Sequence, residues 1–236
     1  MTGVRAAHER LWVTLDGVPD SIVGEPSLLP GWTVGHVLNH LSRNAESHLR
    51  LITGALAGVS ADRYPGGDAE RDALIEDGAR RSAAVLVADV RRVAGELEAA
   101  WAQMTPSSWQ VVGRCIDTDE PAHTSPWNRW REVEIHHADL GLASFGPKDW
   151  SREFLRRELH LAEMSWRASH TLGLTQLPAA ALKLPAHDRL AWLLGRLKVE
   201  GLPSPHDADG DLRVCPGCFV RVRFFGILAS LDGDDV

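Results

Sequence analysis

Residues 28–51, LLPGWTVGHVLNHLSRNAESHLRL, contain the pattern that decides the fold of this chain. Beyond Pro30, apolar residues recur every three or four positions, which is the spacing of one face of an α-helix. Thr33 is a typical N-cap, so a long helix is predicted over residues 34–58. Its polar residues recur at every fourth position: His36, His40, Asn44 and His48. This helix therefore combines an apolar face with a row of imidazoles.

A second stretch, WNRWREVEIHHADLG at residues 127–141, has the same combination. Pro126 suits the first turn of a helix and Gly141 its end, so a helix is predicted between them. Glu132 and His136 lie four residues apart. Four residues advance a helix by about 400°, so these two side chains share one face, about 6 Å apart.

The predicted helices before residue 146 suggest a bundle. They cover residues 4–16, 34–58, 70–103 and 126–140, with an extended piece at 109–115 before the last of them. Helices of this length with mostly modest connections are typical of a four-helix bundle. Facing helices of such a bundle can build a metal site in its core.

The sequence changes character after residue 146. A helix is predicted over 151–172, an extended segment over 177–184 and a short helix over 186–197. The alternation in VRVRF, residues 220–224, predicts a strand. The expected fold class is mainly α, with a four-helix bundle at residues 1–145 and a small α+β domain at residues 146–236.

Composition limits the classes of function. Of the 236 residues, 44% are hydrophobic and 24% charged, as in a soluble globular protein, and the net charge of −7 argues against a nucleic-acid surface. No apolar run reaches the roughly 18–20 residues of a membrane span, and the first residues lack the apolar core of a signal peptide. Three cysteines do not form a disulfide framework. The expected location is the cytoplasm, with no nucleic-acid or membrane partner, and the oligomeric state stays open.

The two histidine-bearing helices contain more candidate ligands than one metal ion needs. Each step of four residues drifts by about 40°, so His36, His40, Asn44 and His48 cannot all point at one spot. His137 lies about 140° from Glu132 around its helix and is expected to point elsewhere. Asp139 is placed to accept a hydrogen bond from a ligating imidazole. Imidazole and carboxylate suit zinc, with iron, manganese or cobalt as alternatives. The non-functional alternative is that these are ordinary helical contacts between polar residues.

Three phrases resemble the mycothiol-dependent maleylpyruvate isomerase family, within the DinB-like bundle superfamily. They are LLPGWTVGHVLNHLSRNAE at 28–46, REVEIHHADLG at 131–141 and, more weakly, LAWLLGR at 190–196. The resemblance implies a DinB-like bundle whose metal ligands are His40, Glu132 and His136. By the same analogy, His36 is not a ligand.

The resemblance also implies the chemistry. A two-histidine, one-carboxylate site leaves a coordination position where water or a thiol is acidified. In the family the thiol is mycothiol, a dissociable cofactor whose thiolate adds to the double bond of maleylpyruvate. Bond rotation and thiol elimination then give fumarylpyruvate. Two alternatives stay open: a mycothiol S-transferase acting on another electrophile, and a non-catalytic module that binds a metal or a thiol as a sensor.

Three further residues are candidates for the same site. Arg196 is the candidate catalytic residue, because a guanidinium grips a substrate or cofactor carboxylate with two parallel hydrogen bonds. Asn44 and His48 are candidates for lining the cofactor pocket. The alternative for Arg196 is an ordinary surface arginine, and for the other two it is a polar position within the bundle.

Cys215 and Cys218 form a Cys-x-x-Cys motif. A redox pair of the thioredoxin type opens a helix after a strand, whereas this motif precedes residues that look like a strand. A four-ligand zinc site needs another cysteine pair, and only Cys115 is left. Residues 203–236 also depart from the family pattern, so no function is assigned to the motif.

Overall fold

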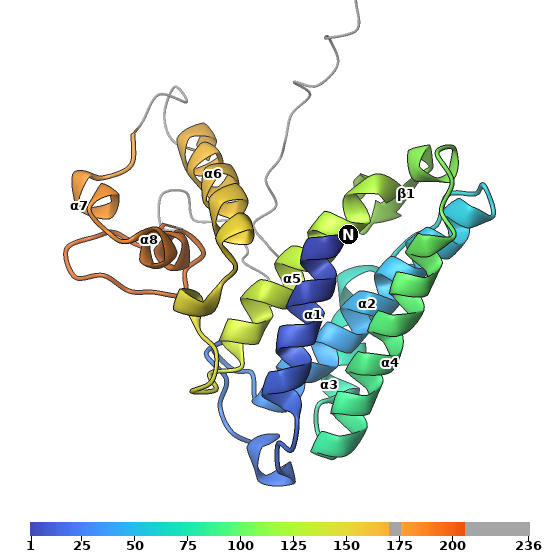
Figure 1. Cartoon of the computed structure of the whole chain (residues 1–236), viewed down its shortest axis with the longest axis horizontal. Helices are drawn as coiled ribbons and strands as arrows, with labels where there is room; N and C mark the ends of the chain where they lie inside the picture. The colour runs from blue at the N-terminus through green and yellow to red at the C-terminus, as the bar shows by residue number, and fades with distance from the viewer. Residues whose placement is uncertain (170–175, 206–236) are drawn as a thin grey trace, which may run out of the picture.

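The computed structural model describes residues 1–169 and 176–205, which are mostly helical (Figure 1). The bundle comprises α1 (Thr2–Leu15), α2 (Val34–Leu56), α3 (Gly67–Gly78), α4 (Ala83–Ala102) and α5 (Ser125–Asp139). The remaining helices are α6 (Arg152–Ser169), α7 (Ala179–Leu182) and α8 (Ala186–Leu193), with short 3-10 turns at Asp20–Ile22, Ser108–Gln110, Ala122–Thr124 and Pro147–Asp149. The two long helices predicted at 34–58 and 126–140 are therefore α2 and α5.

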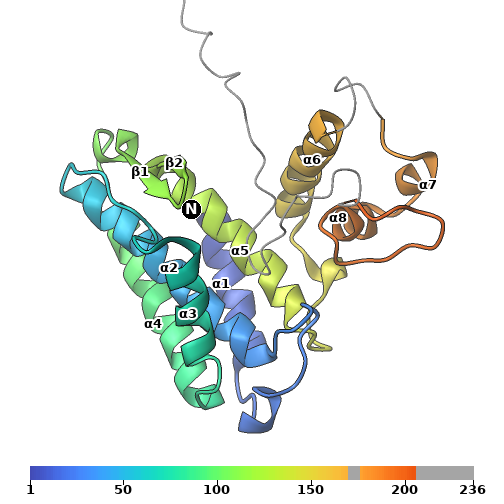
Figure 2. The same ribbon diagram turned by 180° about the vertical axis from the view of Figure 1, so that it is seen from behind.

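Within the bundle, α2 packs against α3, α4 and α5 (Figures 1 and 2). α1 packs against α5 and α4. The core residues of α2 follow the predicted helical spacing, with Val37, Leu38 and Leu41 fully buried. The N-cap prediction is confirmed: the Thr33 hydroxyl accepts from the backbone N–H of His36, and the His36 ring accepts from the N–H of Thr33. This reciprocal cap fixes where α2 begins.

The single helix predicted over residues 70–103 is wrong, because the chain forms α3 and α4 with a break between them. Asn39 of α2 is the physical reason: its amide donates to the carbonyls of Leu74 and Ile75 at 2.9 and 2.7 Å. The Ile75 carbonyl is one of the last four of α3, which lack a partner within the helix. Ser82 then caps α4 by accepting from the N–H of Val85.

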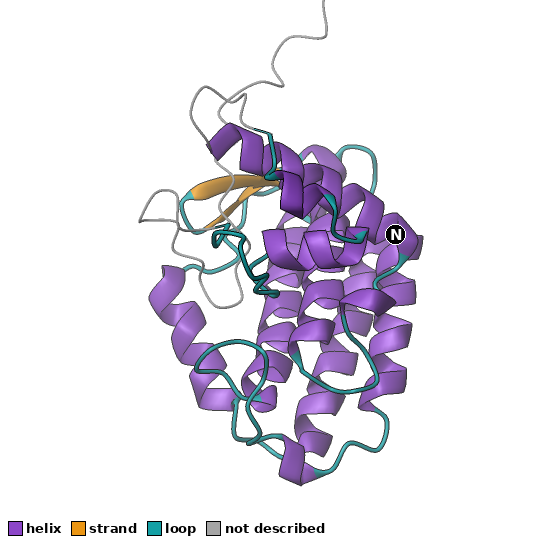
Figure 3. Cartoon of the chain, turned by 90° about the vertical axis from the view of Figure 1, so that its left-hand side faces the viewer, coloured by secondary structure: helices purple, strands orange, loops and turns teal. Residues whose placement is uncertain are grey.

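A small hairpin links α4 to α5. β1 (Val112–Cys115) pairs antiparallel with β2 (Thr118–Pro121), Val112 lying opposite Pro121. The extended piece predicted at 109–115 corresponds to β1 and the turn before it. Figure 3 shows this hairpin as the only sheet in the described part of the chain.

The predicted combination of a helical bundle with a small C-terminal module is confirmed. The extended segment predicted at 177–184 is wrong, since α7 occupies half of it: Pro178 precedes a run of strong helix formers, and Pro185 follows its end. Between residues 146 and 205 the described residues form helices and no strand. The strand predicted at 220–224, and Cys215 and Cys218, lie outside the described residues. The domain boundary at residue 145 stays a prediction.

The C-terminal module packs against the bundle through α5 (Figure 2). Arg131 of α5 donates to both oxygens of Glu158 of α6, at 2.7 and 2.6 Å, and Glu158 is buried. The indole of Trp150 donates to the carbonyl of Glu134 at 2.8 Å. The helix that carries Glu132 and His136 is thus held by the bundle on one side and by the module on the other.

None of the helices in residues 1–169 and 176–205 combines the length and the apolar character that crossing a membrane requires.

Gly35 is a position where only glycine fits. A Cβ added there would overlap the carbonyl oxygen of Ala79 and lie 2.7 Å from the side chain of Val23. Gly35→Ala is therefore expected to lower the free energy of unfolding by about 1–3 kcal/mol, measured by urea denaturation. Gly95→Ala in α4 is the matched control: a Cβ there meets nothing, so it is expected to stabilise by about 0.5–1 kcal/mol. Equal effects of the two substitutions would contradict this prediction.

Candidate metal centre

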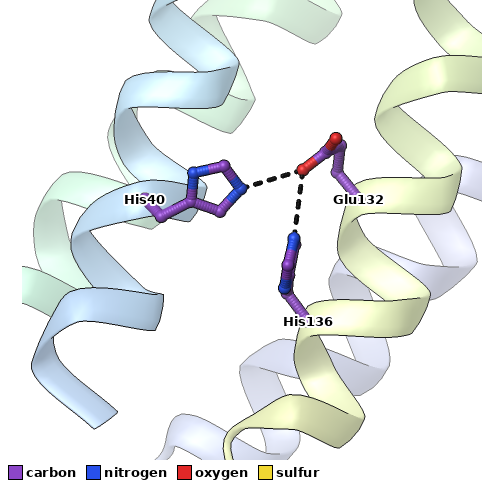
Figure 4. A group of neighbouring side chains, drawn as sticks. All are labelled: His40, Glu132 and His136. Carbon is purple, nitrogen blue, oxygen red and sulfur yellow. Dashed lines mark hydrogen bonds and ion pairs between the residues drawn. The ribbon is translucent and has the colours of Figure 1, made fainter. Parts of the chain in front are cut away.

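His40 from α2 meets Glu132 and His136 from α5 in the core between the two helices (Figure 4). Oε2 of Glu132 lies 2.9 Å from Nε2 of His40 and 3.4 Å from Nε2 of His136. One ligand atom from each residue lies within 4.8 Å of the other two. The two imidazoles meet edge to face, with ring centres 4.6 Å apart. Residues about ninety positions apart in the sequence thus form one cluster.

Asp139 and Arg196 support the cluster from behind. Nδ1 of His136 lies 2.9 Å from Oδ2 of Asp139, a carboxylate with no exposed surface. Nε and Nη2 of Arg196 donate to the two oxygens of Asp139 at 3.2 and 3.1 Å. A carboxylate that accepts from Nδ1–H fixes the ring so that Nε2 of His136 faces Glu132. The predicted place of Asp139 behind a ligating imidazole agrees with this geometry.

The charges of the cluster follow from burial and hydrogen bonding. Burial lowers the pKa of His40 to about 4, although its bond with Glu132 opposes this. Burial would raise the pKa of Glu132, but its hydrogen bonds with His136 and His40 hold that pKa well below its usual value. Burial also acts on His136, but hydrogen bonds with Asp139 and Glu132 outweigh it and raise its pKa. His40 is therefore neutral and Glu132 ionised at neutral pH, and a metal at Nε2 of His136 would compete with a proton for that atom.

The cluster fits a divalent metal ion. Two imidazoles and one carboxylate are a donor set typical of catalytic zinc, which keeps a further position open. With bonds of about 2.0–2.1 Å, tetrahedral ligand atoms lie roughly 3.3 Å apart, close to the observed 2.9 and 3.4 Å. Nδ1 of His40 is buried without a hydrogen-bond partner among the described residues, so this ring is held only on its Nε2 side and by packing. His40, Glu132 and His136 are the residues that would hold the ion.

The other two histidines near the cluster point away from it, as predicted. Nε2 of His36 lies 2.9 Å from Glu76 of α3, and its Nδ1 accepts the cap bond from Thr33. His137 stacks on Phe145 with ring centres 3.5 Å apart. Neither ring contributes to the cluster.

Asn44 and His48 lie in a separate buried network. Oδ1 of Asn44 accepts from Arg129 at 2.9 Å, and Nδ1 of His48 lies 3.1 Å from the hydroxyl of Ser125. The described structure gives neither side chain a hydrogen bond to a member of the cluster. Their role as cofactor-lining residues stays a prediction, as does the catalytic role of Arg196.

Arg129 was missed by the sequence reasoning although a signal was present. It lies three residues before Glu132 and seven before His136, so it falls on the same face of α5. Its side chain is fully buried. An arginine on the ligand face of a buried helix is the pattern that would have identified it.

Asp139→Asn is expected to weaken metal binding about 10- to 100-fold, because an amide is a weaker acceptor for His136 and no longer balances Arg196. Competition with a chromophoric chelator measures the dissociation constant. Asp89→Asn is the control, since Asp89 binds Arg43, Arg81 and Arg92 instead of a ligand. Wild-type affinity in the Asp139 variant would contradict the prediction.

A helical bundle with a buried cluster of two imidazoles and a carboxylate between two helices defines a class of candidate metal-binding bundles. Residues 4–141 match the family model described as the mycothiol maleylpyruvate isomerase N-terminal domain. The chain belongs to this family, which confirms the resemblance seen in its sequence.

Solved structures show the same fold beyond the matched domain. Two of them are crystal structures of the mycothiol-dependent maleylpyruvate isomerase, one with a histidine replaced by alanine. Each is 23% identical to this chain with a TM-score of 0.71, over 83% of this chain and 87% of the other. None of the curated proteins compared matches the sequence.

Proposed function

We propose that this protein is a metal- and mycothiol-dependent isomerase that converts maleylpyruvate to fumarylpyruvate. The observation that carries the proposal is the buried cluster of His40, Glu132 and His136 in a bundle of this family. The proposed reaction is addition of the thiolate to the substrate double bond, rotation about the resulting single bond, and elimination of the thiol. A divalent metal, with zinc as first choice, supplies Lewis acidity that lowers the pKa of a bound thiol.

The residues of the chain prepare the site for this chemistry. Glu132 brings one negative charge and His40 a neutral ring, so the donor set leaves a bound cation with net positive charge. Asp139 orients His136 through Nδ1, and both imidazoles are buried while the Glu132 side chain is 12% exposed. Electrostatic interactions are stronger in such an environment than in water.

Arg196 is the proposed partner for a carboxylate of the substrate or cofactor. Its side chain is 13% exposed, and its two donors to Asp139 are the pair that would grip a carboxylate. An incoming carboxylate would therefore share or compete for the contact with Asp139. Asn44 and His48 are proposed to line the site where the thiol cofactor binds.

The properties of Cys115 favour an external thiol as the nucleophile. Cys115 is the one cysteine within the described residues, and burial raises the pKa of its thiol. A raised pKa disfavours the thiolate, which is the reactive form. A dissociable thiol activated at the cluster is the better candidate nucleophile. The cytoplasmic location expected from the sequence agrees with the use of a reduced thiol.

The test is an ultraviolet assay of metal-loaded protein with maleylpyruvate, in the presence and absence of mycothiol. Turnover is expected only with the thiol, and His40→Ala is expected to abolish it. His36→Ala is the control for loss of an imidazole from the same helix. Turnover without thiol would overturn the proposed mechanism.

The same assay separates the alternatives. No isomerisation, together with conjugation of a model electrophile to mycothiol, would assign the S-transferase. Thiol binding without turnover of either substrate would assign a sensor.

A further inference from the structure

Arg129 is an arginine buried beside the candidate metal centre with no exposed surface. Nη1 donates to the carbonyl of Leu41 at 2.8 Å and to Oδ1 of Asn44 at 2.9 Å. Nε donates to Nε2 of His8 at 3.3 Å. Nη2 has no hydrogen-bond partner in the described part of the chain. Among residues 1–169 and 176–205 no carboxylate binds this guanidinium directly, so an ion pair with them does not explain its burial.

The contacts of Arg129 lie at the level of the three ligands. On α5, Arg129 precedes Glu132 by three residues and shares its face. On α2, the acceptors are the carbonyl of Leu41, which follows His40, and the side chain of Asn44, one helical turn beyond His40. The guanidinium thus joins the two ligand-bearing helices at the point where they approach each other with His40 and Glu132.

The same side chain reaches the other two bundle helices. His8 of α1 accepts from Arg129, and its Nδ1 lies 2.7 Å from Oε1 of Glu98 on α4. Burial lowers the pKa of His8, which keeps the ring neutral and able to accept from Arg129. One buried chain of hydrogen bonds therefore runs from α4 through α1 to α5 and α2.

We propose that Arg129 is a positioning residue for the metal centre. It sets the spacing between α2 and α5 so that His40, Glu132 and His136 reach one ion. The inference rests on the metal site proposed above and concerns the residue that holds its two halves together.

Removal of Arg129 would change metal affinity in two opposite ways, through the loss of its charge and through the loss of the helix spacing. The direction of the change therefore tests the proposal. Burial lowers the pKa of Arg129 to about 10, so it is a cation at neutral pH, close enough to interact with Glu132. Removing a cation near the site would by itself strengthen the binding of a dication. Loss of the spacing would weaken it. A fall in metal affinity after removal of Arg129 therefore reports positioning and not charge.

The experiment measures cobalt(II) binding by chelator competition and by the visible absorption of the bound ion, in the full chain and its variants. Arg129→Met removes the guanidinium and its hydrogen bonds but keeps an unbranched, apolar side chain in the core. Arg63→Met is the matched control: Arg63 is also buried and bonds to α2, but through Ser47, seven residues beyond His40. Thermal unfolding of each metal-free variant reports the loss of stability common to both.

Arg129→Met is expected to bind cobalt about tenfold more weakly or worse, with an altered spectrum, while Arg63→Met keeps wild-type affinity and spectrum. Unchanged or tighter binding in Arg129→Met would overturn the proposal, as would equal weakening in both variants. If Arg129→Met does not fold, Asn44→Ala replaces it, because it removes one acceptor and is expected to weaken binding in the same direction. Wild-type affinity in Asn44→Ala would then count against the proposal. Failure of wild type to bind cobalt would instead contradict the metal site itself.

Discussion

His136→Ala is expected to abolish stoichiometric metal binding, whereas His137→Ala, one residue further along α5, keeps it. His136 contributes Nε2 to the cluster, so the alanine variant leaves only two ligands, and Asp139 keeps Arg196 as its partner. The loss of affinity is expected to exceed the roughly 100-fold that changes behind the ligands produce. Metal content after gel filtration, determined by elemental analysis, provides the measurement.

His137 makes a sharp control because its ring is as buried as that of His136. It stacks on Phe145 and hydrogen-bonds to Thr14, so its loss affects packing and not the cluster. His40→Ala and His36→Ala form a second matched pair on α2. Equal metal content in His136→Ala and wild type would remove the basis for the site.

The metal-free protein is expected to lose stability steeply as the pH falls from 6.5 towards 4. Four histidines are buried in forms that resist protonation: His8, His40, His48 and His137. Burial lowers the pKa of His40 to about 4 and, with the charge of Arg10 adding to it, that of His137 to about 3. In the unfolded chain these rings take up protons near the ordinary value of 6.5.

The sign of the effect follows from proton counting. Below pH 6.5 the unfolded state binds more protons than the folded state, so acidification favours unfolding. Stability from these histidines is complete above that pH and is lost as the pH falls towards the folded values. Each contributes up to about 1.4 kcal/mol per pH unit. His136 acts in the opposite direction, because its raised pKa stabilises the folded state below pH 6.5. Glu132 and Asp139 add to the acid loss only near and below their usual carboxyl values.

Urea unfolding at pH 7.5, 6.5 and 5.5 in the presence of a chelator tests this prediction. His137→Phe is expected to flatten the dependence by up to about 1.4 kcal/mol per pH unit, because one proton-binding difference is removed. Parallel curves for this variant and wild type would show that His137 is not buried in its neutral form.

Helical periodicity predicted the arrangement within each helix but not between helices. Glu132 and His136 were expected to share a face of α5 because four residues advance the helix by slightly more than a turn. In the structure, Oε2 of Glu132 lies 3.4 Å from Nε2 of His136. Which member of the row from His36 to His48 would face them depends on the rotation of α2 against α5. Only the resemblance to a family singled out His40, the residue that meets Glu132.

Tertiary contacts explain what the sequence could not predict. The end of α3 depends on Asn39, a residue of another helix more than thirty positions away. Asn44 and His48 looked suited to a pocket, but their buried partners are Arg129 and Ser125, distant in sequence and identifiable only once α5 is placed. Local propensity contains no information about such partners.

The contact between Arg196 and Asp139 has a consequence for exchange of the C-terminal module between related proteins. Asp139 is a fully buried carboxylate of the bundle, and the guanidinium that balances it comes from the segment after α8. A chimera that replaces this segment without an arginine at the same place would leave an unbalanced charge directly behind His136. Grafting of new substrate specificities onto this bundle must therefore preserve this pairing, together with the contact between Arg131 and the buried Glu158.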